Sequence, residues 1–298
     1  MELEFETLAE GLEGPEGPIV LPDGSCILTE MRAHRISRIW GGGKKEIIAE
    51  MGGTPNGAAL GADGAIYICN SGGEGVQHGE FGGGGRIERI DLTTGRFERI
   101  YDKVNGRPLS APSDLVIDET GGIWFTEFGT VRQRTIEKGG LFWCRPDGSE
   151  IRESYFGGLG YNGVALSPDN RSIHVAASWS GRLFSFALES VGHLATSAET
   201  GTVVPRYAGS ADGESVLDGL AVTASGGVCA ATIIEGGIKT FYQDGRASFV
   251  SLPDKTVTNI AFGGTDMCDA YITLLRTGRL IRARWHEPGH LLNFAERP

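Results

Sequence analysis

Short apolar runs separated by polar turns recur six times along the chain. Each repeat has a characteristic polar residue within its first three positions, runs through four or five apolar residues to a Gly- or Asp-containing turn, and resumes in a second β-rich run. Pairs of short strands joined by tight turns predict β-hairpins. The six repeats occupy residues 14–30, 54–70, 111–127, 160–177, 216–232 and 257–273.

The polar residue at the second or third position of each repeat, just before the apolar run, is its leading residue. The leading residues are Glu16, Asn56, Ser113, Asn162, Asp218 and Thr258. Their separations are 40, 57, 49, 56 and 40 residues. Repeats of that length, built from short strands and Gly-rich turns, are typical of β-propellers. We therefore expect an all-β fold, a six-bladed β-propeller with a central metal site.

Further β-rich runs, such as residues 35–40 and 181–188, complete each blade with three or four strands. The final run, residues 278–285, has no hairpin after it, and residues 3–9 form a suitable partner strand. Pairing between these two runs would leave the ring without an open edge. We expect one domain over residues 1–298, with the N-terminal strand closing the last blade.

Composition limits the possible partners and the compartment. The chain has 298 residues, 47 of them Gly, and a net charge of −11. That charge argues against nucleic acid or an anionic membrane as a partner and suits a cation or a small-molecule substrate. Five scattered cysteines without a C-x-x-C pair favour reduced, buried thiols. With no long apolar segment and no apolar leader, a cytoplasmic protein is expected; the oligomeric state stays open.

The leading residues also predict chemistry, because the innermost strands of a propeller surround one axis. Glu, Asn and Asp oxygens gathered there would form a cage for a hard cation such as Ca²⁺. Asn-Gly and Asp-Gly pairs are also ordinary turn residues, but their recurrence at one position favours a site. Thr258 is not expected to be a ligand. Asn56 remains open between a ligand, a substrate contact and a turn residue.

A second set of polar residues follows about fourteen positions after the leading residues. In a hairpin the start of the first strand and the end of the second lie at the same end, so both sets share one face. The second set comprises Glu30, Asn70, Glu127 and Ser178. The polar insertions at residues 71–84 and 129–139 are candidates for the rim of a binding mouth.

Several of these segments resemble the gluconolactonase/regucalcin (senescence marker protein) family of six-bladed propellers. The most specific are GPEGP around Glu16, APSDLVIDETGGIWFTEFG at 111–129, YNGVALSPDN around Asn162 and LDGLAV around Asp218. The resemblance covers essentially the whole chain. It implies that Glu16, Asn162 and Asp218 hold a divalent cation, usually Ca²⁺, and that the protein opens a sugar-derived or other small lactone.

The chain departs from the family pattern in the third repeat. The family usually has Asn-Asp there, whereas this chain has Ser113-Asp114. Either Ser113 acts through a water or Asp114 is recruited. Ala111 stands where sugar-lactone members of the animal type carry an Arg, which weakens the expectation of a gluconolactone substrate.

For lactone hydrolysis we expect Asp218 and Glu16 to be the catalytic pair. Asp218 would be the general base for water and Glu16 a metal ligand, although the two roles are open to exchange. Substrate contacts are expected from Asn56, Ser113, Asp114 and Glu127. The alternatives are an esterase or phosphotriesterase of the same fold, and a calcium-binding propeller without turnover.

Overall fold

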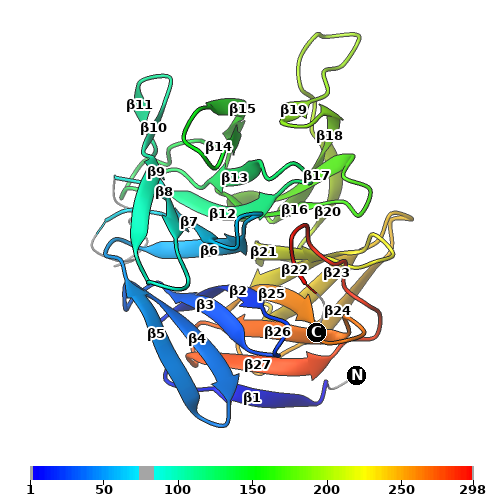
Figure 1. The fold of residues 1–298 in the computed structure, drawn as a ribbon. Helices are drawn as coiled ribbons and strands as arrows, with labels where there is room; N and C mark the ends of the chain where they lie inside the picture. The colour runs from blue at the N-terminus through cyan, green and yellow to red at the C-terminus, as the bar shows by residue number, and fades with distance from the viewer. Residues whose placement is uncertain (1–2, 74–83, 297–298) are drawn as a thin grey trace.

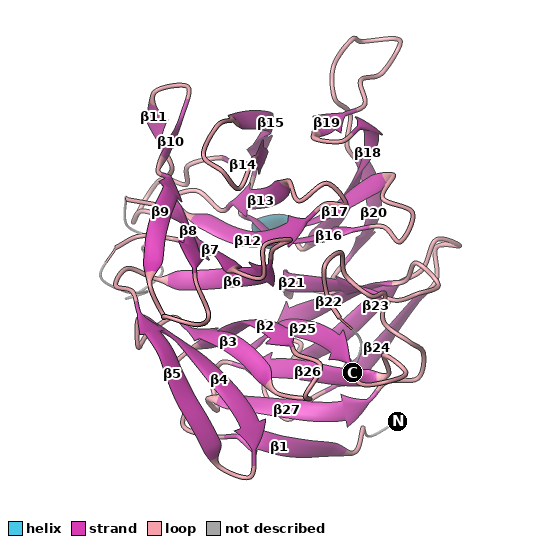
Figure 2. Ribbon diagram, in the orientation of Figure 1, coloured by secondary structure: helices cyan, strands magenta, loops and turns pink. Residues whose placement is uncertain are grey.

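The computed structural model describes residues 3–73 and 84–296. Within these ranges the regular secondary structure is β-strand apart from one short 3-10 helix, η1 (Ser178–Ser180), and loops connect the strands (Figure 2). Six antiparallel sheets radiate from a common centre, which confirms the expected six-bladed β-propeller (Figure 1). Most of insertion 71–84 lies outside the described residues.

Each blade, numbered one to six along the chain, contributes four strands in order from the centre outward. The innermost strands are β2 (Pro15–Val20), β6 (Pro55–Leu60), β12 (Pro112–Ile117), β16 (Tyr161–Leu166), β21 (Val216–Val222) and β25 (Val257–Gly263). The second strands are β3 (Cys26–Glu30), β7 (Ile66–Asn70), β13 (Ile123–Glu127), β17 (Ser172–Ala177), β22 (Val228–Ile233) and β26 (Asp269–Leu274).

The outer half of each blade is built from the next two strands. The third strands are β4 (Arg35–Gly41), β8 (Arg86–Ile90), β14 (Gly139–Cys144), β18 (Arg182–Ser190), β23 (Gly237–Phe241) and β27 (Arg279–Arg284). The outermost are β5 (Lys44–Glu50), β9 (Phe97–Tyr101), β15 (Ile151–Gly158), β20 (Arg206–Ser210), β24 (Ala247–Ser251) and β1 (Phe5–Ala9). Short strands β10 (Lys103–Val104), β11 (Arg107–Pro108) and β19 (His193–Leu194) extend blades two and four.

The first strand of the chain completes the last blade. β1 runs antiparallel to β27, with Phe5 opposite Ala283 and Thr7 opposite Ile281. Around the axis each inner strand contacts the next, and β25 returns to β2. Both ends of the ring are therefore joined through backbone pairing and side-chain packing.

The hydrophobic core is divided among the gaps between blades. Within the described ranges, six clusters of buried apolar side chains each combine residues of two neighbouring blades. Between blades two and three, for example, Tyr67 and Ile87 pack in one cluster with Phe125 and Phe142. Because each blade buries both faces against its neighbours, the second strands are apolar along most of their length.

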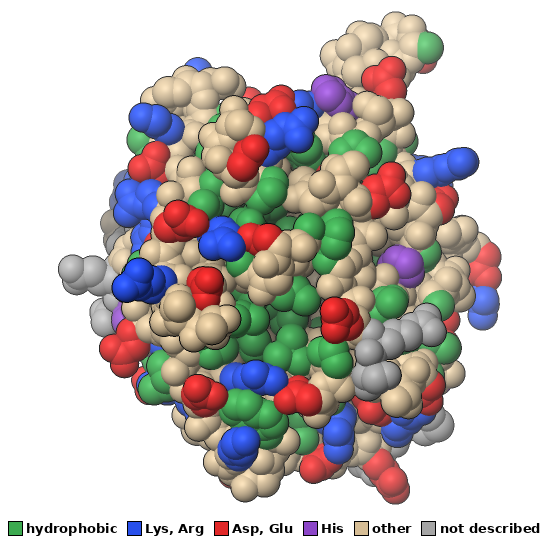
Figure 3. Space-filling model, viewed as in Figure 1, with side chains coloured by type: hydrophobic (Ala, Val, Ile, Leu, Met, Phe, Trp, Pro, Cys, Tyr) green, Lys and Arg blue, Asp and Glu red, His purple; other side chains and the backbone are tan. Residues whose placement is uncertain are grey.

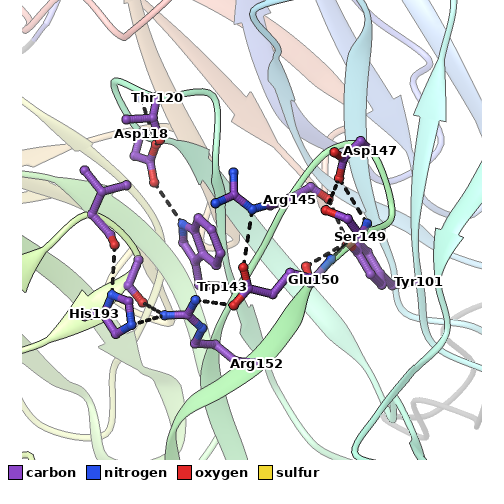
Figure 4. A network of polar contacts seen from close by, with 12 residues as sticks. Tyr101, Asp118, Thr120, Trp143, Arg145, Asp147, Ser149, Glu150, Arg152 and His193 are labelled. Atoms are coloured by element: carbon purple, nitrogen blue, oxygen red, sulfur yellow. Dashed lines mark hydrogen bonds and ion pairs between the residues drawn. The ribbon is translucent and has the colours of Figure 1, made fainter.

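A polar network joins the outer edges of blades two, three and four (Figure 4). The Arg152 guanidinium lies 4.7 Å from the centre of the Trp143 ring, and its Nη1 donates to the Gly192 carbonyl at 2.9 Å. The Tyr101 hydroxyl donates to the Glu150 carbonyl at 2.7 Å. These contacts link the outer strands of neighbouring blades in addition to their apolar packing.

One end of the central channel is lined with apolar side chains. The inner strands and the C-terminal segment 290–296 enclose a cavity of about 110 Å³ there. Hydrophobic side chains gather at the centre of this face, where the C-terminus lies (Figure 1, Figure 3). The segment is fixed by His290 N donating to the Val222 carbonyl at 2.8 Å and Asn293 Nδ2 donating to the Ile117 carbonyl at 3.0 Å.

All five cysteines are unpaired; four are buried and Cys268 is half-buried. Among the described residues, no helix has the length and apolar character needed to cross a membrane.

Candidate functional site

The six inner strands share a local irregularity at their leading residues. In each of them, the pairing with the second strand shifts register at or beside that residue. Such bulges re-aim side chains that a regular strand would send into the sheet. The leading ends of the strands therefore lie together at the channel end opposite the apolar cavity.

Three leading residues from consecutive blades form a hydrogen-bonded chain. Ser113 Oγ donates to Asn162 Oδ1 at 2.8 Å, and Asn162 Nδ2 donates to Asp218 Oδ1 at 2.6 Å. The same Nδ2 lies 3.3 Å from Ser178 Oγ. Ser113 and Asp218 are buried, whereas Asn162 is half-buried. The expected neighbours Ser113, Asn162 and Asp218 thus meet in space although 105 residues separate the first from the last (218 − 113).

Glu16 lies on the same axis, held by backbone and side-chain donors. Its Oε2 accepts hydrogen bonds from Gly17 N and, at 2.8 Å, from Asn259 Nδ2. Burial raises the pKa of its carboxyl group to about 7, against the lowering effect of the two hydrogen bonds. Its charge acts on both Asp114 and Asp218, so the three carboxyl groups share one region.

Asp114 follows Ser113 and reaches across to blade four. Its Oδ1 accepts a hydrogen bond from Leu115 N at 2.9 Å and its Oδ2 accepts one from Val164 N at 3.3 Å. Burial, and then the negative charge of Glu16, raise its pKa well above the ordinary value. Because both oxygens accept backbone N–H groups, the carboxyl group ties blade three to blade four.

Asp218 has the most strongly acidic surroundings of the three. Burial raises its pKa well above the ordinary value, and the charges of Glu16 and Asp114 raise it further. Among the described residues, no Lys, Arg or His forms an ion pair with Glu16, Asp114 or Asp218. Buried carboxylates are normally paired or bound to a metal. This region is therefore short of positive charge.

Glu127 stands apart from that group. It ends β13, its side chain is buried, and its Oε1 accepts a hydrogen bond from Ser110 N. Burial raises its pKa to about 7, and the charge of Glu137 adds to the effect. No hydrogen bond joins it to Glu16, Asn162 or Asp218 within the part of the chain that the structure describes.

Two other leading residues are engaged elsewhere. Asn56 Nδ2 lies 3.4 Å from Ser71 Oγ, which donates to the Pro112 carbonyl at 2.8 Å beside Ser113. Thr258 Oγ1 lies 2.9 Å from the Pro15 carbonyl and 2.8 Å from Thr273 Oγ1. The Thr258 hydroxyl therefore binds the protein itself.

Asn259, which is not among the expected site residues, donates a hydrogen bond directly to Glu16. A signal was present at the position after each leading residue. Four repeats have glycine there, and the third and sixth have Asp114 and Asn259. Asp114 was expected to take part in the site, whereas Asn259, at the same position in the sixth repeat, was not.

The donor set fits a hard cation. Glu16 and Asp218 offer carboxylate oxygens and Asn162 an amide oxygen, which are the ligand types of Ca²⁺. In the described ranges no group of three or more His, Cys, Asp or Glu side chains could hold a metal by itself. The expected trio contains only two residues of those types, so an amide would have to complete it.

Comparison with known proteins gives a consistent result. A family model described as the SMP-30/Gluconolactonase/LRE-like region matches residues 14–276. A gluconolactonase of Zymomonas mobilis is 25% identical over 289 residues, covering 87% of this chain and 76% of that protein. Lactonase drp35 of Staphylococcus haemolyticus is 30% identical over 200 residues, covering 66% of this chain and 57% of that protein.

Solved structures with low sequence identity share the fold. A gluconolactonase from Xanthomonas campestris gives a TM-score of 0.76 at 21% identity, over 95% of this chain and 89% of that one. A calcium-binding protein, regucalcin, from Agrobacterium tumefaciens gives a TM-score of 0.75 at 17% identity, over 98% of this chain and 99% of that one.

Proposed function

The chain belongs to the SMP-30/gluconolactonase/LRE-like family, and on that premise we propose that it is a metal-dependent hydrolase that opens a small lactone with water. One observation carries the proposal. Glu16, Asp114 and Asp218 are buried around one axis, and no described basic side chain pairs with them. A divalent cation would neutralise this cluster.

Glu16, Asn162 and Asp218 are the proposed ligands of that cation, and Ca²⁺ is the proposed metal. The relatives named gluconolactonase and lactonase drp35 support the reaction class. The structural neighbour described as a calcium-binding protein supports the choice of metal. When bound, the cation would polarise the lactone carbonyl as a Lewis acid and lower the pKa of a water.

Asp218 is the proposed general base. Its carboxylate would take a proton from the attacking water and return it to the alkoxide released when the lactone ring opens. Asn162 is held between Ser113 and Asp218, and its Nδ2 already donates to Asp218 and Ser178, so its proposed part is to offer Oδ1 to the cation. Glu16 is the alternative base.

Substrate contacts are proposed for Asn56, Ser113 and Glu127, which lie at the leading end of blades two and three. The proposed contribution of Asp114 is indirect, since both of its oxygens already accept backbone N–H groups. Its charge would favour the cation, and its bonds would fix blade four beside Asn162.

A proton-release assay tests the function. Protein stripped with EDTA would be offered sugar lactones, alkyl lactones, aryl esters and a phosphotriester, with Ca²⁺, Mg²⁺, Mn²⁺ or Zn²⁺ restored singly. We expect lactone opening that Ca²⁺ restores. Faster turnover of the esters or the phosphotriester would move the activity to that class. Tight Ca²⁺ binding without turnover of any substrate would replace the enzyme with a calcium-binding propeller.

A further inference from the structure

Blades three and six differ from the other four blades at the position that follows the leading residue. At the position after the leading residue, the other four blades have Gly17, Gly57, Gly163 and Gly219. Blades three and six carry Asp114 and Asn259 there. These two polar side chains lie in blades on opposite sides of the six-membered ring.

The preceding blade's glycine makes room for each of these side chains. A Cβ on Gly219 would collide with the Asn259 amide, and a Cβ on Gly57 would collide with the Asp114 carboxyl group. Asn259 and Asp114 then each accept their own next backbone N–H and reach forward to the following blade. For Asn259 the following blade is blade one, and the group it reaches is Glu16.

The orientation of the Asn259 amide is fixed by its neighbours. Ile260 N donates to Asn259 Oδ1 at 2.8 Å, so the oxygen must face that N–H and Nδ2 must face the carboxylate. Asn259 Nδ2 then donates to Glu16 Oε2 at 2.8 Å. A reversed amide would place an oxygen against a carboxylate oxygen and would leave the Ile260 N–H without an acceptor.

Both donors bind the same oxygen of Glu16. Gly17 N and Asn259 Nδ2 converge on Oε2, and none of the hydrogen bonds described for residues 3–73 and 84–296 reaches Oε1. An oxygen that already accepts two N–H groups is a poorer metal ligand than its free neighbour. Asn259 is also nearly enclosed, with 5% of its surface exposed.

We propose that Asn259 is a positioning residue that holds Glu16 through Oε2, so that Glu16 presents Oε1 alone to the cation. This inference rests on the proposed cation site. Residues that orient a metal ligand typically contribute about 10- to 100-fold to metal affinity.

Calorimetric titration of Ca²⁺ into EDTA-stripped protein tests the inference. Asn259→Leu keeps bulk over Gly219 but removes the donor, whereas Asn259→Ala removes both. We expect Ca²⁺ affinity to fall about 10- to 100-fold in both variants. Asn70→Ala is the matched control: Asn70 is a fully buried amide that binds the Gly52 carbonyl and Glu88 away from the axis. This control should keep wild-type Ca²⁺ affinity, even if it melts earlier.

The outcomes separate the inference from the function. Wild-type affinity in folded Asn259→Leu and Asn259→Ala overturns the inference and leaves the proposed function standing. If Ca²⁺ affinity falls in Asn259→Ala but not in Asn259→Leu, Asn259 only fills space, and the inference is again overturned. Absence of Ca²⁺ binding by the wild type would overturn both. Should the leucine and alanine variants fail to fold, Asn259→Ser, whose hydroxyl is too short to reach Glu16, carries the same expectation.

Discussion

Two buried glutamates at equivalent positions in different blades have opposite acidities. Glu30 ends β3 and Glu127 ends β13, and both side chains are enclosed. Burial opposes ionisation of Glu30, but Arg35, Lys45 and Ser37 outweigh it and hold its pKa at about 2. Glu127 has backbone donors and no described cation, so burial raises its pKa to about 7. The surrounding partners decide the charge of the carboxyl group.

Glu127→Gln should therefore change how stability depends on pH. A carboxyl group whose pKa is higher in the folded state destabilises folding as pH rises from its ordinary 4.5 to about 7. We expect the free energy of unfolding to fall less in the variant than in the wild type across this window, by on the order of 1 to 3 kcal/mol. Urea unfolding of the metal-free proteins at several pH values measures it. Glu98→Gln, at an exposed position, is the control; parallel curves for Glu127→Gln and wild type would refute the expectation.

Asp218→Asn should remove the proposed base while keeping the side-chain shape. Loss of a general base typically lowers turnover by about 10²- to 10⁴-fold, and kcat for the best lactone is the measurement. Glu16→Gln, assayed in parallel at saturating Ca²⁺, decides between the two carboxylates. If kcat falls more in Glu16→Gln while Asp218→Asn retains turnover with metal bound, the two roles must be exchanged.

Among the elements, strand β1 joins the two ends of the chain by pairing with β27. β1 supplies the outer strand of blade six and places Leu8, 4% exposed, in the cluster between blades six and one. Without β1 the edge of β27 would be exposed, and open edges invite pairing with other chains. Strand β1 pairs with β27 within the two runs, residues 3–9 and 278–285, for which the sequence predicts pairing.

Deleting residues 1–10 should destabilise the whole propeller. Removing the buried Leu8 side chain alone costs about 2–5 kcal/mol, and the ladder with β27 is lost as well. Urea denaturation gives the free energy of unfolding, and light scattering reports self-association through the exposed edge. Phe5→Ala alters a side chain that is 39% exposed on the same strand and should have a small effect. An unchanged unfolding midpoint after the deletion would contradict the structural importance of β1.

At the scale of the whole molecule, the inner ring converts local sequence into one site. Glu16, Asn162 and Asp218 belong to blades one, four and five, so a shared ligand would hold together strands from distant parts of the chain. At the opposite end, the C-terminal segment contacts Ile117 and Val222 and crosses the apolar cavity. The two ends of the channel thus differ in polarity although the same six strands form both.

Calcium should raise the stability of the whole molecule by linkage. A ligand that binds only the folded state at 100 times its dissociation constant adds about 2.7 kcal/mol. We expect a higher melting temperature in Ca²⁺ than in EDTA, with most of the increase absent from Asp218→Asn. Thermal unfolding followed by circular dichroism is the measurement. An equal increase in wild type and variant would place the stabilising ion away from the axis.

The fold was predictable because its signals are local and repeated. Hairpin turns such as Asp63-Gly64, with a short apolar run on each side, recur in each blade. The six leading residues mark where each inner strand begins. Family membership, and with it the lactonase class of relatives, followed from the segments around Glu16, Asn162 and Asp218. The ligand, base and substrate-contact roles of individual residues remain predictions.

The amino-acid sequence alone determined that the chain forms six β-rich repeats with a polar residue at the head of each, because strand period and turn chemistry act over a few neighbouring residues. Tertiary structure decided which polar residues act together. Thr258 turns to the Pro15 carbonyl while its neighbour Asn259 reaches Glu16, a pairing across 243 residues of chain. Such contacts depend on a bulge, on the space above Gly219 and on closure of the ring. Burial, likewise a property of the assembled ring, decided the acidity of Glu16 and Asp218.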